Sequence, residues 1–272
     1  MGYGKKAVLW KPMLSLINQF VYRPDSAFAP PDFTPAELGL AFEEVAVETA
    51  DGLALSGWYL PAWNATHALM YCHGNAGDIR DWVQAAPPFV ESRISVLVWD
   101  YRGYGRSEGE PSEEGLYMDG RAMWAWLKER AAQDGLPASI LGKSLGSAIA
   151  IQIGIEDQPT SMILDSAFTS MREIVALHAY WVPQALIPKL YESLEKVPGI
   201  TSPTLLLHGG QDQLVPLSQG ESLFEALSAP KSMHVIPAAG HNDISSFSNY
   251  HQAILRFLAD PAGYTDGKQT II

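Results

Sequence analysis

Residues 139–150 read Ser-Ile-Leu-Gly-Lys-Ser-Leu-Gly-Ser-Ala-Ile-Ala. Their pattern predicts a short strand, a sharp Gly-x-Ser-x-Gly turn and a helix rich in Ala and Ile. A serine on such a turn must adopt a strained backbone, which lifts its hydroxyl clear of the sheet, while the glycines keep other side chains away. The helix that follows aims backbone N–H groups at any negative charge formed there. Ser144 is therefore the candidate nucleophile.

The same pattern occurs a second time, from Gly105 to Gly109, with Ser107 at its centre. Glu, Gly, Glu and Pro follow this serine, and these residues do not begin a helix at that point. We therefore expect Ser107 to lie in a loop and not to act as a nucleophile. The strand and helix around Ser144 distinguish the two occurrences.

The length of the chain suits one large α/β domain or two small ones, and because the sequence contains no linker, low-complexity run or internal repeat, we expect one domain spanning residues 1–272. The chain has 272 residues, of which 47% are hydrophobic and 18% charged, so it can bury a substantial core. Its net charge of −12 argues against nucleic acid or an anionic membrane as the main partner. The single cysteine, Cys72, excludes an intramolecular disulfide and a multi-cysteine metal site. No residues cluster with metal-ligand spacing, so we expect neither a metal nor a cofactor.

Residues 7–22 have the spacing of an amphipathic helix, with apolar pairs at 9/10, 13/14, 16/17 and 20/21. The run is interrupted by Lys11 and Pro12, and it is too short to span a bilayer. No small-residue cleavage site follows it, so we expect a cytoplasmic protein. We expect this helix to pack on the body of the protein. Peripheral membrane contact through residues 7–22 is the alternative.

Apolar runs alternate with helical segments along the rest of the chain. An Asp-Gly turn at residues 51–52 predicts an antiparallel hairpin, and the continuous apolar run 94–100 is typical of a strand covered on both faces. The pattern predicts a mostly parallel eight-stranded sheet with helices on both faces. Its strands are expected at 42–49, 53–60, 68–72, 94–100, 139–141, 161–165, 204–208 and 232–236. Helices are expected at 78–91 (broken near Pro87), 112–130, after Ser144, 217–228 and 246–259, with a small helical cap over about 166–200.

Polar side chains follow several of these strands, and the carboxyl ends of parallel strands gather reactive groups. Ser144 follows the fifth strand, Asp212 the seventh and His241 the eighth. This is the chain order of a nucleophile, an acid and a base on such a sheet. A serine hydroxyl is a weak nucleophile, so an imidazole must take its proton and a carboxylate must orient the imidazole. Asp165, after the sixth strand, is the rival acid.

With these residues, the chain resembles the α/β-hydrolase superfamily over nearly its whole length. The matching motifs are His-Gly at the third strand, Asp-Tyr-Arg-Gly-Tyr-Gly-x-Ser after the fourth, the nucleophile turn, His-Gly-x-x-Asp after the seventh and Gly-His before the last helix. The chain is similar to the esterase- and thioesterase-like branch that carries His-Gly-Asn-Ala-Gly, here at residues 73–77. The resemblance implies an oxyanion hole made by the backbone N–H groups of Leu145 and Asn75, with Ala76 as the alternative to Asn75.

The residues and the resemblance together predict a serine hydrolase that cleaves small carboxylic esters through an acyl-enzyme. An acyl thioesterase, a serine aminopeptidase and a catalytically inactive binding protein are the alternatives. Lys143 is expected to point away from the site, and Asp243 to cap the helix that follows it. Four aromatic residues are expected to bind the substrate and to favour an apolar acyl or alcohol group. They are Phe168, Tyr180, Trp181 and Trp82.

Overall fold

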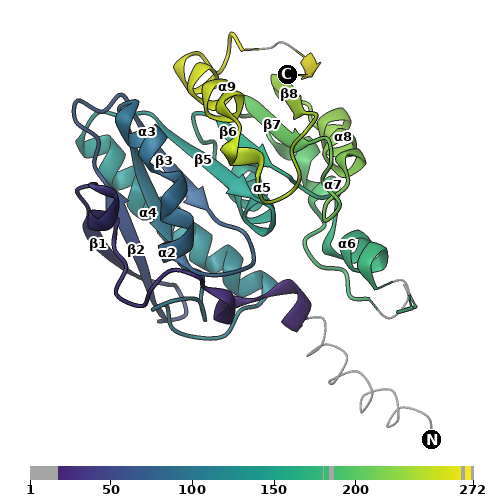
Figure 1. Cartoon of the computed structure of the whole chain (residues 1–272), viewed down its shortest axis with the longest axis horizontal. Coiled ribbons are helices and arrows are strands. Elements are labelled where there is room, and N and C mark those ends of the chain that lie inside the picture. Colours follow the sequence, from purple (N-terminus) through teal and green to yellow (C-terminus); the bar gives the residue numbers. More distant parts are fainter. Residues whose placement is uncertain (1–17, 180, 184–186, 265–266, 271–272) are drawn as a thin grey trace, which may run out of the picture.

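Nine strands form the sheet around which the described residues are arranged, in the order β1-β2-β4-β3-β5-β6-β7-β8-β9 (Figure 1). The computed structural model describes residues 18–179, 181–183, 187–264 and 267–270. The eight strands expected from the sequence are all present, and β9 is an addition that the sequence did not indicate. Their bounds are β1 Glu43–Glu48, β2 Ala54–Leu60, β3 His67–Cys72, β4 Ile94–Trp99, β5 Ala138–Lys143, β6 Met162–Asp165, β7 Thr204–Gly209, β8 Lys231–Ile236 and β9 Gly267–Thr270.

The first two strands form the expected antiparallel hairpin. Gly52 makes its turn with φ +82°, a value that an L side chain rarely adopts, and donates its N–H to Thr49 O over 2.9 Å. β2 also pairs antiparallel with β4, whereas every pair from β4 through β3 to β9 is parallel. The carboxyl ends of the parallel strands therefore meet at one edge of the sheet, where the candidate residues follow them.

Helices cover both faces of this sheet (Figure 1). Successive side chains of a strand point to opposite faces. In β3, Met70 packs in a core with α4, α5 and α8, whereas Leu69 packs in a second core with α2, α3 and α9. Because both faces are covered, β3, β4 and β7 are buried along their whole length. The helices span α2 Ile79–Trp82, α3 Pro87–Glu91, α4 Glu113–Gln133, α5 Leu145–Glu156, α8 Leu217–Ala226 and α9 Ser248–Ala259.

Two helix boundaries follow from local chemistry. The Ser112 hydroxyl accepts a hydrogen bond from Gly115 N over 3.2 Å and so begins α4 as expected. The expected helix over 78–91 is divided into α2, a 3-10 turn and α3. Pro87 starts α3, because the first residue of a helix needs no N–H donor.

The insert between β6 and β7 contains α6 (Met171–His178), α7 (Ser193–Lys196) and a short 3-10 turn. Figure 1 shows α6 set off from the sheet, beside the first described part of the chain. An aromatic contact between Phe20 and His178, with ring centroids 6.3 Å apart, joins these two segments. The insert therefore stands over the carboxyl edge of the sheet together with the chain's first described residues.

Most of the amphipathic helix expected at 7–22 lies outside the described residues. Residues 18–21 are helical, and Val21 and Tyr22 are buried in the core. The Tyr22 hydroxyl is 2.7 Å from the Tyr191 hydroxyl, within hydrogen-bond distance. This end of the segment therefore packs against the body. No helix in the described part of the chain is long and apolar enough to cross a membrane.

Candidate functional site

Ser144 makes the turn between β5 and α5, because β5 ends at Lys143 and α5 begins at Leu145. Its backbone has φ 51° and ψ −116°, a strained conformation for a residue with a side chain. The Ser144 N–H donates to Asp165 O over 2.8 Å, and this bond to the end of β6 helps to hold the turn. The structure thus places Ser144 on a sharp strand-to-helix turn, as its sequence pattern predicts.

The two glycines of the pattern allow α5 to start close to the sheet. A Cβ on Gly142 would overlap the backbone of α5 at Gly146 and Ser147. A Cβ on Gly146 would overlap the carbonyl oxygen of Cys72, at the end of β3. Backbone atoms cannot move aside as the far end of a side chain can. Glycine is therefore required at both positions if α5 is to present its N-terminus beside Ser144.

Asp212 and His241 lie within direct hydrogen-bond distance. His241 Nδ1 is 2.7 Å from Asp212 Oδ2, and the other carboxylate oxygen accepts the N–H groups of Leu214 (2.9 Å) and Val215 (2.7 Å). Burial alone would raise the pKa of Asp212, but the hydrogen bond and charge of His241 and the Val215 N–H outweigh it, so this pKa is lowered. An ionised carboxylate can only accept, so Nδ1 carries the proton. In a neutral imidazole, Nε2 then carries no proton and can accept one from another group.

Asp165, the rival acid, has different partners. Its Oδ1 accepts from Lys143 Nζ and from Ser166 Oγ, both over 2.9 Å, and its Oδ2 accepts from Tyr250 OH over 2.9 Å. These donors hold the Asp165 carboxylate in a buried network beside the Ser144 turn. The carboxylate that contacts the His241 imidazole is that of Asp212.

Two expectations about neighbouring residues were wrong. Lys143 does not point away from the site, because its Nζ donates to the backbone carbonyl of His241 over 2.8 Å. Asp243 does not cap the helical turn after it, because its Oδ1 instead accepts the N–H of Gly240 over 2.7 Å. Both bonds stabilise the loop that carries His241.

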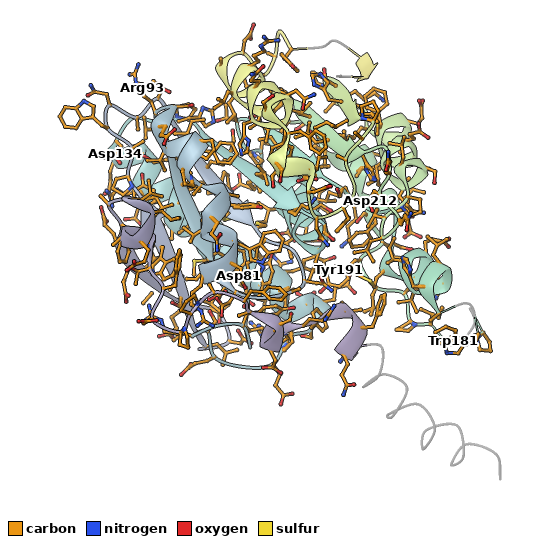
Figure 2. The ribbon with its side chains drawn as sticks, viewed as in Figure 1. Asp81, Arg93, Asp134, Trp181, Tyr191 and Asp212 are labelled. Atoms are coloured by element: carbon orange, nitrogen blue, oxygen red, sulfur yellow. The ribbon has the colours of Figure 1, made fainter. Side chains whose placement is uncertain are left out.

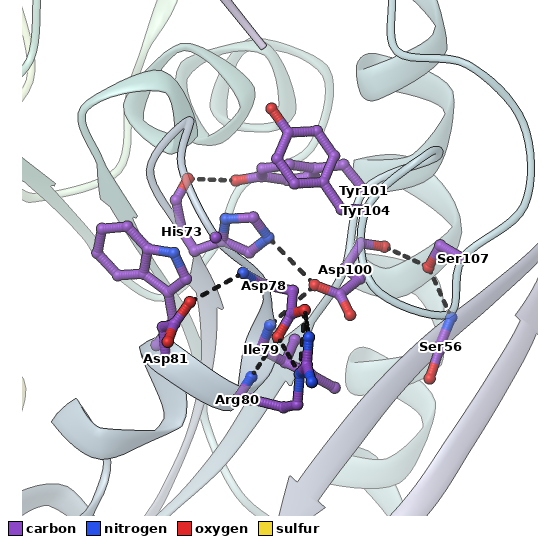
Figure 3. Close-up of polar contacts among 12 residues, drawn as sticks. Ser56, His73, Asp78, Ile79, Arg80, Asp81, Asp100, Tyr101, Tyr104 and Ser107 are labelled. Atoms are coloured by element: carbon purple, nitrogen blue, oxygen red, sulfur yellow. Dashed lines mark hydrogen bonds and ion pairs between the residues drawn. The ribbon is translucent and has the colours of Figure 1, made fainter. Parts of the chain in front are cut away.

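The loop at residues 73–77 follows β3, and its carbonyl groups have hydrogen-bond donors; Figure 3 shows the one that joins Tyr101 to His73. Tyr101 OH donates to His73 O over 2.6 Å, His73 Nδ1 to Gly74 O over 2.6 Å, Tyr104 OH to Asn75 O over 2.9 Å and Trp82 Nε1 to Ala76 O over 2.8 Å. In a trans peptide, a carbonyl and the next N–H point in opposite directions. Because Gly74 O faces the His73 ring, the Asn75 N–H points away from that ring.

Buried polar groups support this loop from beneath. His73 Nε2 lies 3.6 Å from Asp100 Oδ1, and Ile79 N donates to the same oxygen over 2.9 Å (Figure 3). Burial raises the pKa of Asp100, and its contacts with His73 oppose that shift only in part. The Ser107 hydroxyl donates to Asp100 O over 2.8 Å and accepts from Ser56 N over 2.9 Å. Ser107 therefore lies in a loop, as expected, and its hydroxyl is used in holding that loop.

A cavity of about 250 Å³ opens beside Ser144. Leu145 and Asn75, the two residues expected to supply oxyanion donors, line the same cavity. The rest of its lining is mostly apolar and comes from the first described segment, the insert and the turn after Asp212. These residues are Gln19, Phe20, Val21, Arg23, Phe168, Met171, Ile174, Leu214 and Val215.

Of the four aromatic residues expected to bind substrate, Phe168 lines this cavity. Trp82 instead lies behind the 73–77 loop, where its ring stacks on His73 at a centroid distance of 5.8 Å. Trp181 is 68% exposed and lies at the outer end of the insert (Figure 2), and Tyr180 is outside the described residues. Sequence reasoning missed Phe20 and Val21 as lining residues, although their apolar spacing had placed them on one helical face.

The part of the chain that the structure describes contains no group of three or more His, Cys, Asp or Glu side chains placed to hold a metal ion. The chemistry visible at the site is that of a serine on a strained turn, an imidazole held by a carboxylate, and backbone N–H groups beside a cavity.

The chain is similar in sequence to known proteins. A family model described as "Serine aminopeptidase, S33" matches residues 64–196. The uncharacterized protein Rv2307c of Mycobacterium tuberculosis (strain ATCC 25618 / H37Rv) is 38% identical over 227 residues, which cover 82% of this chain and 81% of that protein. The human alpha/beta hydrolase domain-containing protein 17B is 29% identical over 198 residues, covering 72% of this chain and 67% of that protein.

The fold is also similar to that of solved structures. The Pyrococcus furiosus esterase Pf2001 superposes with a TM-score of 0.71 over 86% of this chain and 97% of that chain, at 22% sequence identity. An alpha-beta hydrolase from Vibrio vulnificus gives a TM-score of 0.71 over 91% of this chain and 93% of that chain, at 21% identity. At such identities the likeness concerns the fold alone. Together with the sequence relatives and the strand order, it shows that this chain belongs to the α/β-hydrolase superfamily.

Proposed function

We propose that this protein is a serine hydrolase that cleaves carboxylic esters through an acyl-enzyme intermediate. In this proposal Ser144 attacks the ester carbonyl, His241 takes the serine proton, and Asp212 orients His241. The observation that carries the proposal is the hydrogen bond of 2.7 Å between His241 Nδ1 and Asp212 Oδ2. It selects the tautomer in which Nε2 acts as the base, the role that an imidazole has in such triads.

The oxyanion of the tetrahedral intermediate would be held by two backbone N–H groups. Leu145 is the first residue of α5, so its N–H has no partner within the helix. The Asn75 N–H points away from the His73 ring, and both residues line the cavity beside Ser144. A donor of this kind stabilises the transition state by about 3–4 kcal/mol in studied hydrolases. His241 would then return the proton to the leaving alcohol, and water would release the acid from Ser144.

The lining of the cavity supports an apolar acyl group over a substrate with a free amine. Phe168, Met171 and Ile174 present apolar side chains to it. An aminopeptidase has to bind the charged amine of its substrate, for which a carboxylate is the usual partner. Among the described residues that line the cavity there is no Asp or Glu. We therefore prefer an ester to an aminoacyl amide as the substrate, although the family model that matches this chain is described as a serine aminopeptidase.

The test combines covalent labelling with a substrate panel made of an ester and a thioester that share one acyl chain, together with an aminoacyl amide. We expect a fluorophosphonate probe to label the protein and the oxygen ester to be hydrolysed faster than the matched thioester and aminoacyl amide. Ser144→Ala should abolish both reactions, since the loss of one triad residue costs up to about 10⁶ in kcat. Ser107→Ala is the control and should retain them. A folded parent protein that neither reacts with the probe nor hydrolyses any member of the panel would refute the proposal, and a faster thioester would identify a thioesterase.

A further inference from the structure

Lys143 is a buried cation whose three donors all have acceptors. Its side chain is 6% exposed, and that of Asp165 is 1% exposed. Nζ donates to Asp165 Oδ1 over 2.9 Å, to Ser166 Oγ over 3.1 Å and to His241 O over 2.8 Å. An ammonium group has three N–H bonds, so this set satisfies it completely. The register of the sheet creates the pair, because Lys143 and Asp165 are partners at the ends of the parallel strands β5 and β6.

Two of these acceptors are themselves held in place. Tyr250, on α9, donates its hydroxyl to the second oxygen of Asp165 over 2.9 Å. Ser166 has φ 50° and donates its N–H to Leu207 O over 2.9 Å, so its position is fixed by β7. The acceptors around the ammonium are therefore anchored in β6, β7 and α9, and Nζ has little freedom to move.

The third acceptor is the carbonyl of the residue whose imidazole is bound to Asp212. His241 lies in the loop between β8 and α9, and one hydrogen bond holds its side chain while another holds its main chain. Asp212 holds the imidazole through Nδ1 over 2.7 Å, and Lys143 holds the main chain through the carbonyl over 2.8 Å. Because Lys143 immediately precedes Ser144, the bond ties the His241 loop directly to the turn that carries the serine.

We propose that Lys143 is a positioning residue that sets the placement of His241 relative to Ser144. The proposal rests on the proposed function, because it assigns Lys143 a part in the transfer of a proton between those two residues. Lys143 touches neither substrate nor reacting atoms. Displacement of a catalytic group by about 1 Å can lower the rate about 100-fold. The loss of this tether should therefore lower kcat and leave the cavity, and with it KM, nearly unchanged.

The alternative is that Lys143 and Asp165 form an ion pair that only stabilises the fold. To exclude it, the experiment must separate an effect on stability from an effect on the placement of His241. In Lys143→Met alone, Asp165 would stay buried without its counter-charge, which destabilises a protein whatever the role of the pair. The double variant Lys143→Met/Asp165→Asn removes both charges and still lacks the bond to His241 O. Lys231→Met is a matched control, because Lys231 also donates to backbone carbonyls, those of Phe224 (2.6 Å) and Leu227 (2.8 Å), at the amino end of β8.

The measurements are kcat and KM on the ester that the parent protein hydrolyses, the rate of fluorophosphonate labelling, and the melting temperature. We expect kcat and the labelling rate to fall about 10- to 100-fold in the single variant and to stay low in the double variant while its melting temperature recovers. Lys231→Met should keep the parent kcat. A double variant that recovers kcat along with its stability overturns the proposal. Parent-level kcat in a folded Lys143→Met refutes the positioning role alone, whereas a parent protein inert to ester and probe refutes the proposed function and this role with it.

Discussion

Arg23 donates its backbone N–H to the carbonyl oxygen of Asn75 over 2.9 Å, joining the first described segment of the chain to the loop beside Ser144. Gly77 N donates back to Arg23 O over 3.2 Å, so the two segments form a short parallel bridge. Phe20 and Val21, just before this bridge, line the cavity. One segment therefore supplies part of the cavity wall and also braces the loop that is proposed to bind the oxyanion.

The first prediction concerns the acid. Asp212→Asn should lower kcat by about 10⁴, because an amide can donate to Nδ1 and so stabilise the wrong tautomer of His241. Asp165→Asn should cost much less, because the partners of Asp165 are Lys143, Ser166 and Tyr250. The comparison of kcat in the two variants, each checked for folding, decides the assignment. A larger loss in Asp165→Asn would transfer the role of acid to the end of β6.

The second prediction concerns stability at low pH. The pKa of Asp212 is lower in the folded protein than its ordinary value of 3.8. Its carboxylate therefore stabilises the fold fully above that value, and this contribution is lost as the pH falls through the lowered pKa. The melting temperature of the parent protein should fall more steeply than that of Asp212→Asn below about pH 4. Parallel curves from pH 6 down to pH 3 would contradict the prediction.

The third prediction concerns Gly146, the glycine that follows Ser144 by two residues. Gly146→Ala would drive a Cβ into the carbonyl oxygen of Cys72, so either α5 or the end of β3 must shift. We expect the free energy of unfolding to fall by about 1–3 kcal/mol, which is the typical cost of overpacking a core site. We also expect a large fall in kcat. Gly199→Ala is the control, because its Cβ would lie at an ordinary 3.4 Å from Ile155. Denaturant unfolding and ester kinetics of both variants provide the check, and equal behaviour would contradict this account of the turn.

The positions of the strands along the chain and the residues of the candidate triad could be predicted from the sequence for a physical reason. Strands covered on both faces read as continuous apolar runs, and the polar residue that ends such a run lies at the carboxyl edge of the sheet. Asp212 and His241 were found in this way, and their contact confirms that the two lie together. The sequence offered Asp165 by the same rule, and only its hydrogen-bond partners separate it from Asp212.

Other features depend on contacts that no local pattern encodes. Lys143 points inward because the register of β5 with β6 places it beside Asp165, and register is not readable from either strand alone. β9, which reads Gly-Lys-Gln-Thr, has no alternation of apolar residues to indicate a strand. The spacing of residues 7–22 predicted an apolar face, but it did not say that Phe20 and Val21 would face a cavity beside Ser144.

The fourth prediction concerns the length of the acyl group. Ile174 lies on α6, is 4% exposed and lines the cavity, so Ile174→Trp should occupy space that a longer chain needs. The ratio of kcat/KM for an octanoyl ester to that for an acetyl ester should fall, with the acetyl ester little affected. Leu177→Trp is the matched control, because Leu177 is on the same helix but 49% exposed. An unchanged ratio in Ile174→Trp would show that the acyl group binds elsewhere.

The fifth prediction concerns the N-terminal segment, residues 1–22. Deletion of residues 1–22 removes Val21 and Tyr22, which are buried, and takes the partner from the Tyr191 hydroxyl. It should therefore lower both the melting temperature and kcat. Sedimentation with phosphatidylcholine vesicles tests the alternative, because the net charge of −12 opposes anionic surfaces but not neutral ones. We expect no sedimentation of the full chain, since the described end of the segment packs on the body and its flanking cations are few. Co-sedimentation that is lost when residues 1–22 are removed, with an unchanged melting temperature, would contradict that expectation and would make acyl groups presented at a membrane the natural substrates to test.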